Sequence, residues 1–512
     1  MEYQATSAAV DADAEARRKR AVLAAVCLAA LVLPLSFAGA VVALPAIARD
    51  LGGGPVALGW VVNGFMLSFG SCLMGAGSLA DRHGRRRVFV LGVGLFALAS
   101  LCIGLSPDLL TVNLLRAAQG VGAAGALAGG SAVLAQEYEG PGRARAFGLL
   151  GTTFGVGLAL GPVLTGLLVE GLGWRAVFLS GTLLGALALC FGPRRMRESR
   201  DPQADRTDWP GIASFTLALL ALTYGVLQAP ETGWASTETL LALSLAAAGA
   251  WAFVQLEKRH PRPMLDLSLF RYPLFLGVQV LPMATCFCYV VLLVVLPIRF
   301  IGIEGWSETS AGLMMFSLSA PMLAVPLLAA RLADRFAPHA LSGAGLLVAA
   351  AGLAGLAFLG PGAPPVLLAG CMFTAGLGAA VPWGLMDGLS VSVVPRERAG
   401  MATGIFSTTR VAGEGVSIAV AGALLALFSS RGLERLTAGG PEREILARAA
   451  QRLASGDLER TAGLLPEVAR EALVRAYAYA FQDLLLLLCA LTVASAALIV
   501  MLFRRSGAAR AG

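Results

Sequence analysis

The feature that most constrains this chain is a series of apolar runs, each long enough to cross a lipid bilayer. A spanning helix needs about 20 predominantly apolar residues. The chain has 512 residues, of which 57% are hydrophobic and 14% are charged, a composition far from that of soluble domains. We therefore expect an all-α polytopic membrane protein with fourteen transmembrane helices, near residues 21–48, 58–79, 88–106, 109–135, 147–170, 174–192, 211–229, 239–256, 272–299, 310–331, 339–359, 363–390, 402–428 and 477–503.

The distribution of basic residues predicts the orientation of these helices. With a cytoplasmic N-terminus, the cytoplasmic segments carry 26 Lys and Arg residues and the short outer segments carry 3. Cytoplasmic loops of membrane proteins are enriched in Lys and Arg, so we expect both termini in the cytoplasm and a multi-pass protein of the cell (inner) membrane. The net charge of +7 is scattered between helices, which argues against nucleic acid as a partner.

Side chains suited to catalysis are scarce. Lysine occurs only at Lys19 and Lys258, and neither follows a glycine, so the phosphate-binding G-x-x-x-x-G-K-[ST] loop is absent. The eight cysteines lie in apolar runs without the spacing of a metal site. We expect no enzyme activity, no metal and no cofactor, and an ion gradient as the energy source for any transport.

Two short segments recur at nearly the same offset, which indicates an internal duplication. Leu-Ala-Asp-Arg at 79–82 recurs at 332–335, and Gly-x-Gly-Ala-Ala at 120–124 recurs at 376–380. These repeats are parallel. They pair the helix expected at 58–79 with the one at 310–331, and the helix at 109–135 with the one at 363–390. The predicted arrangement is 6+2+6: an N-terminal tail 1–20, a six-helix bundle 21–192, a linker with two inserted helices 193–262, a second bundle 263–503 that includes an outer loop 430–476, and a tail 504–512.

Three motifs carry a family resemblance. Residues 77–87 read G-S-L-A-D-R-H-G-R-R-R, residues 116–122 read R-A-A-Q-G-V-G, and residues 157–166 read G-L-A-L-G-P-V-L-T-G. They resemble motifs A, B and C of the major facilitator superfamily, and motif C is typical of its antiporters. Together with fourteen spans, the sequence looks like the 14-helix drug:proton antiporters of the EmrB/QacA type.

The resemblance implies a function and roles for individual residues. It implies a proton-coupled exporter of drugs or small amphipathic metabolites that works by alternating access, with the small molecule, protons and the lipid bilayer as partners. Motif A implies a conformational latch in which Asp81 contacts the start of the helix near 402–428. Motif B implies that Arg116 is a buried arginine that takes part in proton coupling, with Gln119 beside it. Motif C implies a hinge. The latch residues are Gly77, Asp81, Arg82, Gly84 and Arg85, and the hinge residues are Gly157, Gly161, Pro162 and Gly166.

One departure from the family pattern concerns the proton site. Ser36 stands where the family commonly has an acid in helix 1. Other acids inside helices could replace it. Glu414 follows Arg410 by four residues, on one helical face, and either binds the coupling proton or forms a structural pair with that arginine. Asp387 is a second candidate, unless it lies near the cytoplasmic end and is solvated.

The buried charges and the outer loop suggest two further expectations. Arg116 and Arg410 make the cavity less negative, so we expect an anionic, zwitterionic or neutral amphipathic substrate. The loop 430–476 should form amphipathic helices near 441–453 and 466–478 that cap the outer cavity, while docking of a periplasmic adaptor has no sequence signal of its own. The alternative function is a membrane sensor or lipid-handling protein on the same fold without coupled efflux, and only Ser36 favours it.

Overall fold

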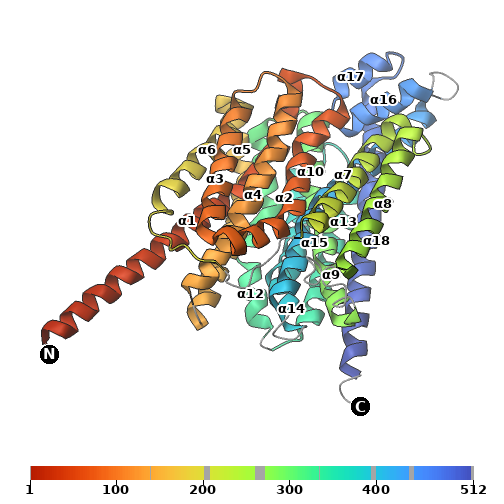
Figure 1. The fold of residues 1–512 in the computed structure, drawn as a ribbon. Helices are drawn as coiled ribbons and strands as arrows, with labels where there is room; N and C mark the ends of the chain where they lie inside the picture. The colour runs from red at the N-terminus through yellow and green to blue at the C-terminus, as the bar shows by residue number, and fades with distance from the viewer. Residues whose placement is uncertain are drawn as a thin grey trace.

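The computed structural model describes residues 2–138, 140–200, 208–259, 271–333, 335–393, 399–437 and 443–508, and all regular structure in these ranges is helical. Both termini lie on one face, the terminal face, and α16 and α17 lie on the opposite face, the cap face (Figure 1). The first eight helices are α1 Glu2–Leu51, α2 Pro55–His83, α3 Arg85–Gly104, α4 Leu109–Glu137, α5 Gly140–Leu172, α6 Trp174–Phe191, α7 Trp209–Thr232 and α8 Thr237–Arg259. The others are α9 Pro273–Thr285, α10 Val291–Pro297, α11 Glu308–Ser319, α12 Val325–Leu332, α13 Pro338–Ala357, α14 Pro365–Ser392, α15 Ala399–Leu436, α16 Arg443–Ala454, α17 Leu458–Leu464 and α18 Arg470–Ala508.

Fourteen helical segments are long and apolar enough to cross a membrane, which confirms the predicted number. Two spans contain irregular turns. The span Leu274–Ile303 joins α9 and α10 through a π-helical turn, Cys286–Val290, and the span Glu308–Leu332 joins α11 and α12 through a 3-10 turn, Ala320–Leu323. Prolines lie in both spans, and a proline removes a backbone hydrogen bond from a helix.

The helices pack as two bundles with an inserted pair beside them. In the first bundle α4 packs on α2 and α3, and α1 on α5 and α6; in the second, α13 packs on α14 and α18, and α15 on α18. The inserted helices α7 and α8 pack on each other, and α7 also contacts α2 and α15, one helix of each bundle (Figure 1). The bundles meet directly where α2 packs on α15 and α5 on α11.

The duplicated glycines explain the close packing inside each bundle. A Cβ added to Gly122 would lie 2.6 Å from the backbone nitrogen of Phe96 on α3, and one added to Gly378 would lie 2.1 Å from that of Ala349 on α13. Small residues allow helix backbones in a membrane to approach closely, and this contact is a main source of helix association there. The repeat detected in the sequence is therefore a repeated packing contact.

The described part of the outer loop is folded, with one expected helix in place and the other beginning later than expected. α16, Arg443–Ala454, agrees with the helix expected near 441–453. The helix expected at 466–478 begins only at Arg470, after a turn, and is the first part of the long helix α18 rather than a separate short helix. The helix between them, α17, is short, and Leu453, Leu458 and Leu465 are buried. We call α16, α17 and the turn between them the cap.

The glycine contact can be tested by thermal unfolding in detergent. Gly122→Val should destabilise the protein by about 1–3 kcal/mol, the usual cost of overpacking, because the side chain meets the backbone of α3. Gly94→Val on α3 is the control, since a Cβ at Gly94 meets no atom within 4 Å. Equal melting temperatures for the two variants would contradict this account.

Candidate functional site

Arg116 on α4 is completely buried and is held by uncharged groups. Its Nε donates to the carbonyl of Val61 at 2.7 Å, and its Nη1 donates to Ser36 Oγ at 3.1 Å and to Gln119 Oε1 at 2.5 Å. Its Nη2 has no hydrogen-bond partner within the described ranges. The structure therefore brings together three residues that the sequence analysis assigned to the central cavity.

Aromatic rings and a second hydrogen-bond chain fix this arginine in place. Its guanidinium carbon lies 4.4 Å from the ring centroid of Phe65 and 5.7 Å from that of Phe178, where cation–π attraction is favourable. Gln119 Nε2 donates to Ser100 Oγ at 2.6 Å, and Ser100 donates to the carbonyl of Phe96 at 2.7 Å. Gln119 thus has partners at both ends of its amide.

No acidic side chain forms an ion pair with Arg116 in the part of the chain that the structure describes. Ser36, only 8% exposed, stands at the position of the family's helix 1 acid and accepts one hydrogen bond without supplying charge. A buried charge is costly unless it is paired. Among the described residues, the positive charge of Arg116 is therefore uncompensated.

Arg410 and Glu414 lie one turn apart on α15, close to where the bundles meet. The guanidinium carbon of Arg410 lies 6.0 Å from the ring centroid of Trp383 and 5.8 Å from that of Phe406. The charges of Arg410 and Glu414 are near enough to interact. Gly415, next to Glu414, lies against α2, since its added Cβ would be 3.3 Å from Met66 Cβ. Asp387 belongs to α14, but its side chain lies outside the described residues.

Motif A forms the connection between α2 and α3. Asp81 accepts hydrogen bonds from Arg85 Nε at 3.1 Å and Nη2 at 2.9 Å. Gly84 has φ of +119°, a conformation that favours glycine, and Arg82 is exposed. Gly77 shows no close contact, since an added Cβ would meet no atom within 4 Å. The implied contact of Asp81 with the start of α15 involves side chains outside the described residues.

Motif C divides its contacts between the two bundles. Added Cβ atoms at Gly157 and Gly161 would lie 2.4 Å from Pro34 Cγ and 3.0 Å from Ala38 Cβ, both on α1 of the same bundle. An added Cβ at Gly166 would instead lie 2.5 Å from the carbonyl oxygen of Glu308 on α11 of the other bundle. The carbonyl of Pro162 similarly lies against Gly312 of α11. This division of one motif was not visible in the sequence.

Polar contacts join the two bundles on the cap face. Arg49 at the end of α1 forms an ion pair with Glu308 at the start of α11. The backbone N–H of Thr309 donates to Glu170 Oε2 at 3.3 Å, and Arg452 of the cap donates to the carbonyl of Gly53 at 2.9 Å. These contacts close the cap face. No sequence pattern predicts these contacts, because Arg49 is simply one of the three basic residues of the short outer segments.

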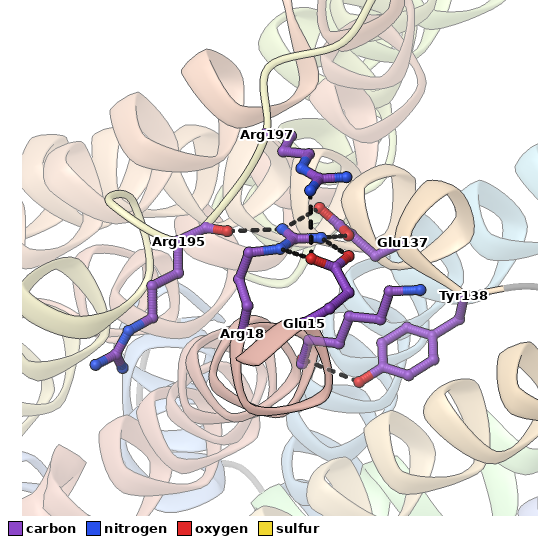
Figure 2. A network of polar contacts seen from close by, with 7 residues as sticks. Glu15, Arg18, Glu137, Tyr138, Arg195 and Arg197 are labelled. Carbon is purple, nitrogen blue, oxygen red and sulfur yellow. Dashed lines mark hydrogen bonds and ion pairs between the residues drawn. The ribbon is translucent and has the colours of Figure 1, made fainter. Parts of the chain in front are cut away.

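A network of charged residues holds the terminal face of the first bundle together (Figure 2). Arg18 of α1 pairs with Glu15 and with Glu137 at the end of α4, and donates to the carbonyl of Arg195 at 2.8 Å. Arg197 also pairs with Glu15, at 3.2 Å. This network ties α1 to α4 and to the segment after α6, so these arginines have a packing role beyond membrane orientation.

The closure of the cap face can be tested by charge reversal. The reporter is a single cysteine, Val294→Cys, in a cysteine-free background, and its rate of labelling by a membrane-impermeant maleimide is measured. Arg49→Glu should raise this rate by about two- to fivefold, because exposed ion pairs contribute up to about 1 kcal/mol. Glu308→Arg added to Arg49→Glu should restore the original rate. Arg175→Glu is the control, since Arg175 pairs with Asp50 on the same face within one bundle. An identical rise in the control would refute the role of the cross-bundle pair.

Sequence comparison with known proteins shows the family of this chain. The profile of the Major Facilitator Superfamily matches residues 26–418. The chain is 35% identical over 395 residues, 77% of its length and 73% of the relative's, to the multidrug resistance protein Stp of Mycobacterium tuberculosis. It is 31% identical over 409 residues, 79% of its length and 75% of the relative's, to the tetracenomycin C resistance and export protein of Streptomyces glaucescens.

Solved structures show the same fold. A bacterial homologue of the human lysosomal transporter Spinster, in an inward-facing and unoccupied conformation, superposes with a TM-score of 0.64 at 18% identity, covering 95% of this chain and 97% of that one. A POT family transporter bound to 5-aminolevulinic acid gives a TM-score of 0.61 at 12% identity, covering 94% and 95%. The chain is a transporter rather than an enzyme, and it belongs to the major facilitator superfamily, among the multi-pass drug exporters of cell membranes.

Proposed function

We propose that this exporter exchanges small amphipathic molecules for protons, with Glu414 as the proton-binding group and Arg116 as a fixed charge beside the substrate path. Relatives are named for resistance to tetracenomycin C, methylenomycin A and puromycin, which supports a role in moving foreign or self-made antibiotics. The observation that carries the proposal is the placement of Glu414 beside the contact between α15 and α2, where the bundles must move relative to each other.

The position of Glu414 links protonation to movement. Next to it, Gly415 lies against Met66. Ala412, two residues before Glu414, packs so closely on α2 that an added Cβ at Gly70 would be 2.7 Å from its backbone nitrogen. Neutralising Glu414 removes a charge from the side of α15 near α2 and leaves the charge of Arg410 unbalanced on the same helix, which changes the electrostatic cost of moving α15 along α2. A proton taken up at Glu414 can thereby favour one arrangement of the bundles.

The charge at Arg116 determines the substrate class in this proposal. Because Ser36 supplies no charge and no described acid pairs with Arg116, a permanent cation near it would be repelled, whereas a carboxylate, a sulfonate or a neutral acceptor group would not. Helices of both bundles line the path, so the substrate need not contact Arg116 in every state. We infer that export favours anionic, zwitterionic or neutral amphipathic compounds.

Proton coupling is tested with Glu414→Gln in proteoliposomes with an imposed pH gradient. The variant should lose proton-driven transport of 8-anilinonaphthalene-1-sulfonate, an amphipathic anion, because the amide cannot bind and release the proton. Glu434→Gln, at the exposed end of the same helix, should transport normally. Undiminished transport by Glu414→Gln, at equal protein level, would leave Glu414 a structural residue.

Substrate charge is tested by supplying the missing acid. Ser36→Asp places a carboxylate beside Arg116 Nη1 and should shift the ratio of ethidium to anilinonaphthalenesulfonate transport at least about tenfold toward ethidium, which corresponds to roughly 1.4 kcal/mol. Ser36→Asn is the matched uncharged control and should keep the wild-type ratio. Efficient ethidium transport by the wild type, with the anion ignored, would overturn the proposed substrate class.

A further inference from the structure

Two irregular turns of the second bundle are joined by one buried hydrogen bond. Tyr289 lies in the π-helical turn Cys286–Val290, and Ser319 ends α11, directly before the 3-10 turn Ala320–Leu323. The hydroxyl of Tyr289 donates to Ser319 Oγ at 3.1 Å, and both side chains are fully buried. Separating them would leave a buried hydroxyl without its partner, which is costly. The two turns are therefore held to each other.

The π-helical turn lets one short segment contact three other helices. The thiol of Cys286 donates to the carbonyl of Arg410 on α15 at 3.8 Å, whereas Tyr289 contacts Ser319 on α11 and Trp383 on α14. In a regular α-helix, residues three positions apart lie on one face. A π-helical turn is wider, and such turns are frequent at functional sites. The widening directs Tyr289 away from α15 and toward α11 and α14.

The ring of Tyr289 is connected to Arg410 through Trp383. The ring centroids of Tyr289 and Trp383 lie 6.1 Å apart, with an angle of 63° between the ring planes, an edge-to-face arrangement that is favourable for aromatic pairs. Trp383 in turn lies 6.0 Å from the guanidinium carbon of Arg410, which interacts with Glu414 on the same helix. A displacement of Trp383 therefore changes where the charge of Arg410 lies relative to Glu414.

The other end of this series of contacts reaches the first bundle. An added Cβ at Gly155 on α5 would lie 3.0 Å from the carbonyl oxygen of Met322, in the 3-10 turn that follows Ser319. This turn therefore rests against the opposite bundle, and movement of α5 relative to α11 displaces it. Packed side chains and hydrogen bonds in a continuous series are the physical means by which distant sites influence each other.

We propose that Tyr289 is a positioning residue that links the contact between the bundles at Gly155 to the place of Arg410 beside Glu414. Its hydroxyl follows the 3-10 turn through Ser319, and its ring holds Trp383. Movement of α5 thereby changes the electrostatic surroundings of Glu414. The inference deepens the proposed function and rests on it for the role of Glu414 in proton binding.

The positioning role is tested by the fluorescence anisotropy of Trp383, in full-length protein in nanodiscs in which Trp383 is the only tryptophan. Tyr289→Phe keeps the ring and should lower the anisotropy, because the ring that packs on Trp383 loses its hydrogen bond. Ser319→Ala should lower it equally, and the double variant should show no further loss. Tyr477→Phe is the matched control, since Tyr477 is also fully buried but its hydroxyl has no hydrogen-bond partner within the described ranges.

The link to the first bundle is tested in the same protein. Gly155→Ala should lower the anisotropy of Trp383, because the added Cβ meets the backbone at Met322. Gly151→Ala, one turn earlier on α5, is the matched control, since its Cβ would meet no atom within 4 Å. Size-exclusion profiles check that each variant is folded. Equal anisotropy in these two alanine variants, or an unchanged value in Tyr289→Phe, would overturn the proposal.

A transport measurement distinguishes positioning from simple packing. Tyr289→Phe should lower proton-driven transport of 8-anilinonaphthalene-1-sulfonate in proteoliposomes about two- to tenfold, the effect of one hydrogen bond. Exchange of labelled for unlabelled compound at equal pH needs no net proton movement and should stay at the wild-type rate. An equal loss of both activities, or a loss of neither, would make Tyr289 a packing residue. Undiminished proton-driven transport by Glu414→Gln would instead refute the proton site, and the anisotropy of Trp383 would still decide the role of Tyr289.

Discussion

Close contact between small residues is the constraint on which this structure depends. Lipid gives helices no hydrophobic reason to associate, so packing and hydrogen bonds must hold them together. Inside each bundle the duplicated glycines Gly122 and Gly378 bring backbones into contact. Between the bundles, Gly70, Gly166 and Gly312 do the same. Contacts of this kind are broad and shallow, so helices can separate and return without leaving buried polar groups unpaired.

The contacts between bundles differ in kind from one face to the other. On the cap face, glycine contacts are reinforced by the Arg49–Glu308 pair and by the bond from Arg452 to Gly53. On the terminal face, the described ion pairs around Arg18 stay within the first bundle. Opening the cap face therefore breaks polar contacts between bundles, while the network of Figure 2 can move with its bundle as one body.

The sequence predicted the number of spanning helices because the length of an apolar run is a local signal, and the repeat at 120 and 376 marked a packing contact that both bundles share. It also grouped Ser36, Arg116 and Gln119, which the structure places in hydrogen-bond contact. It did not predict that Gly166 contacts the second bundle, nor that Tyr289 and Ser319 share a hydrogen bond. Those features depend on how distant helices are placed. The helix expected at 466–478 begins only at Arg470 and continues into the last span, so that it forms the start of α18.

The uncharged surroundings of Arg116 have a consequence for the energetics of a transport cycle. Exchange of one cation for one proton moves no net charge, so only the pH difference drives it. An anion that leaves as one proton enters transfers two charges in the same direction, and each charge is worth about 2.3 kcal/mol per 100 mV of membrane potential. In the proposed exchange of an anion for a proton, the voltage across the membrane, rather than acidity alone, would therefore power expulsion of a compound.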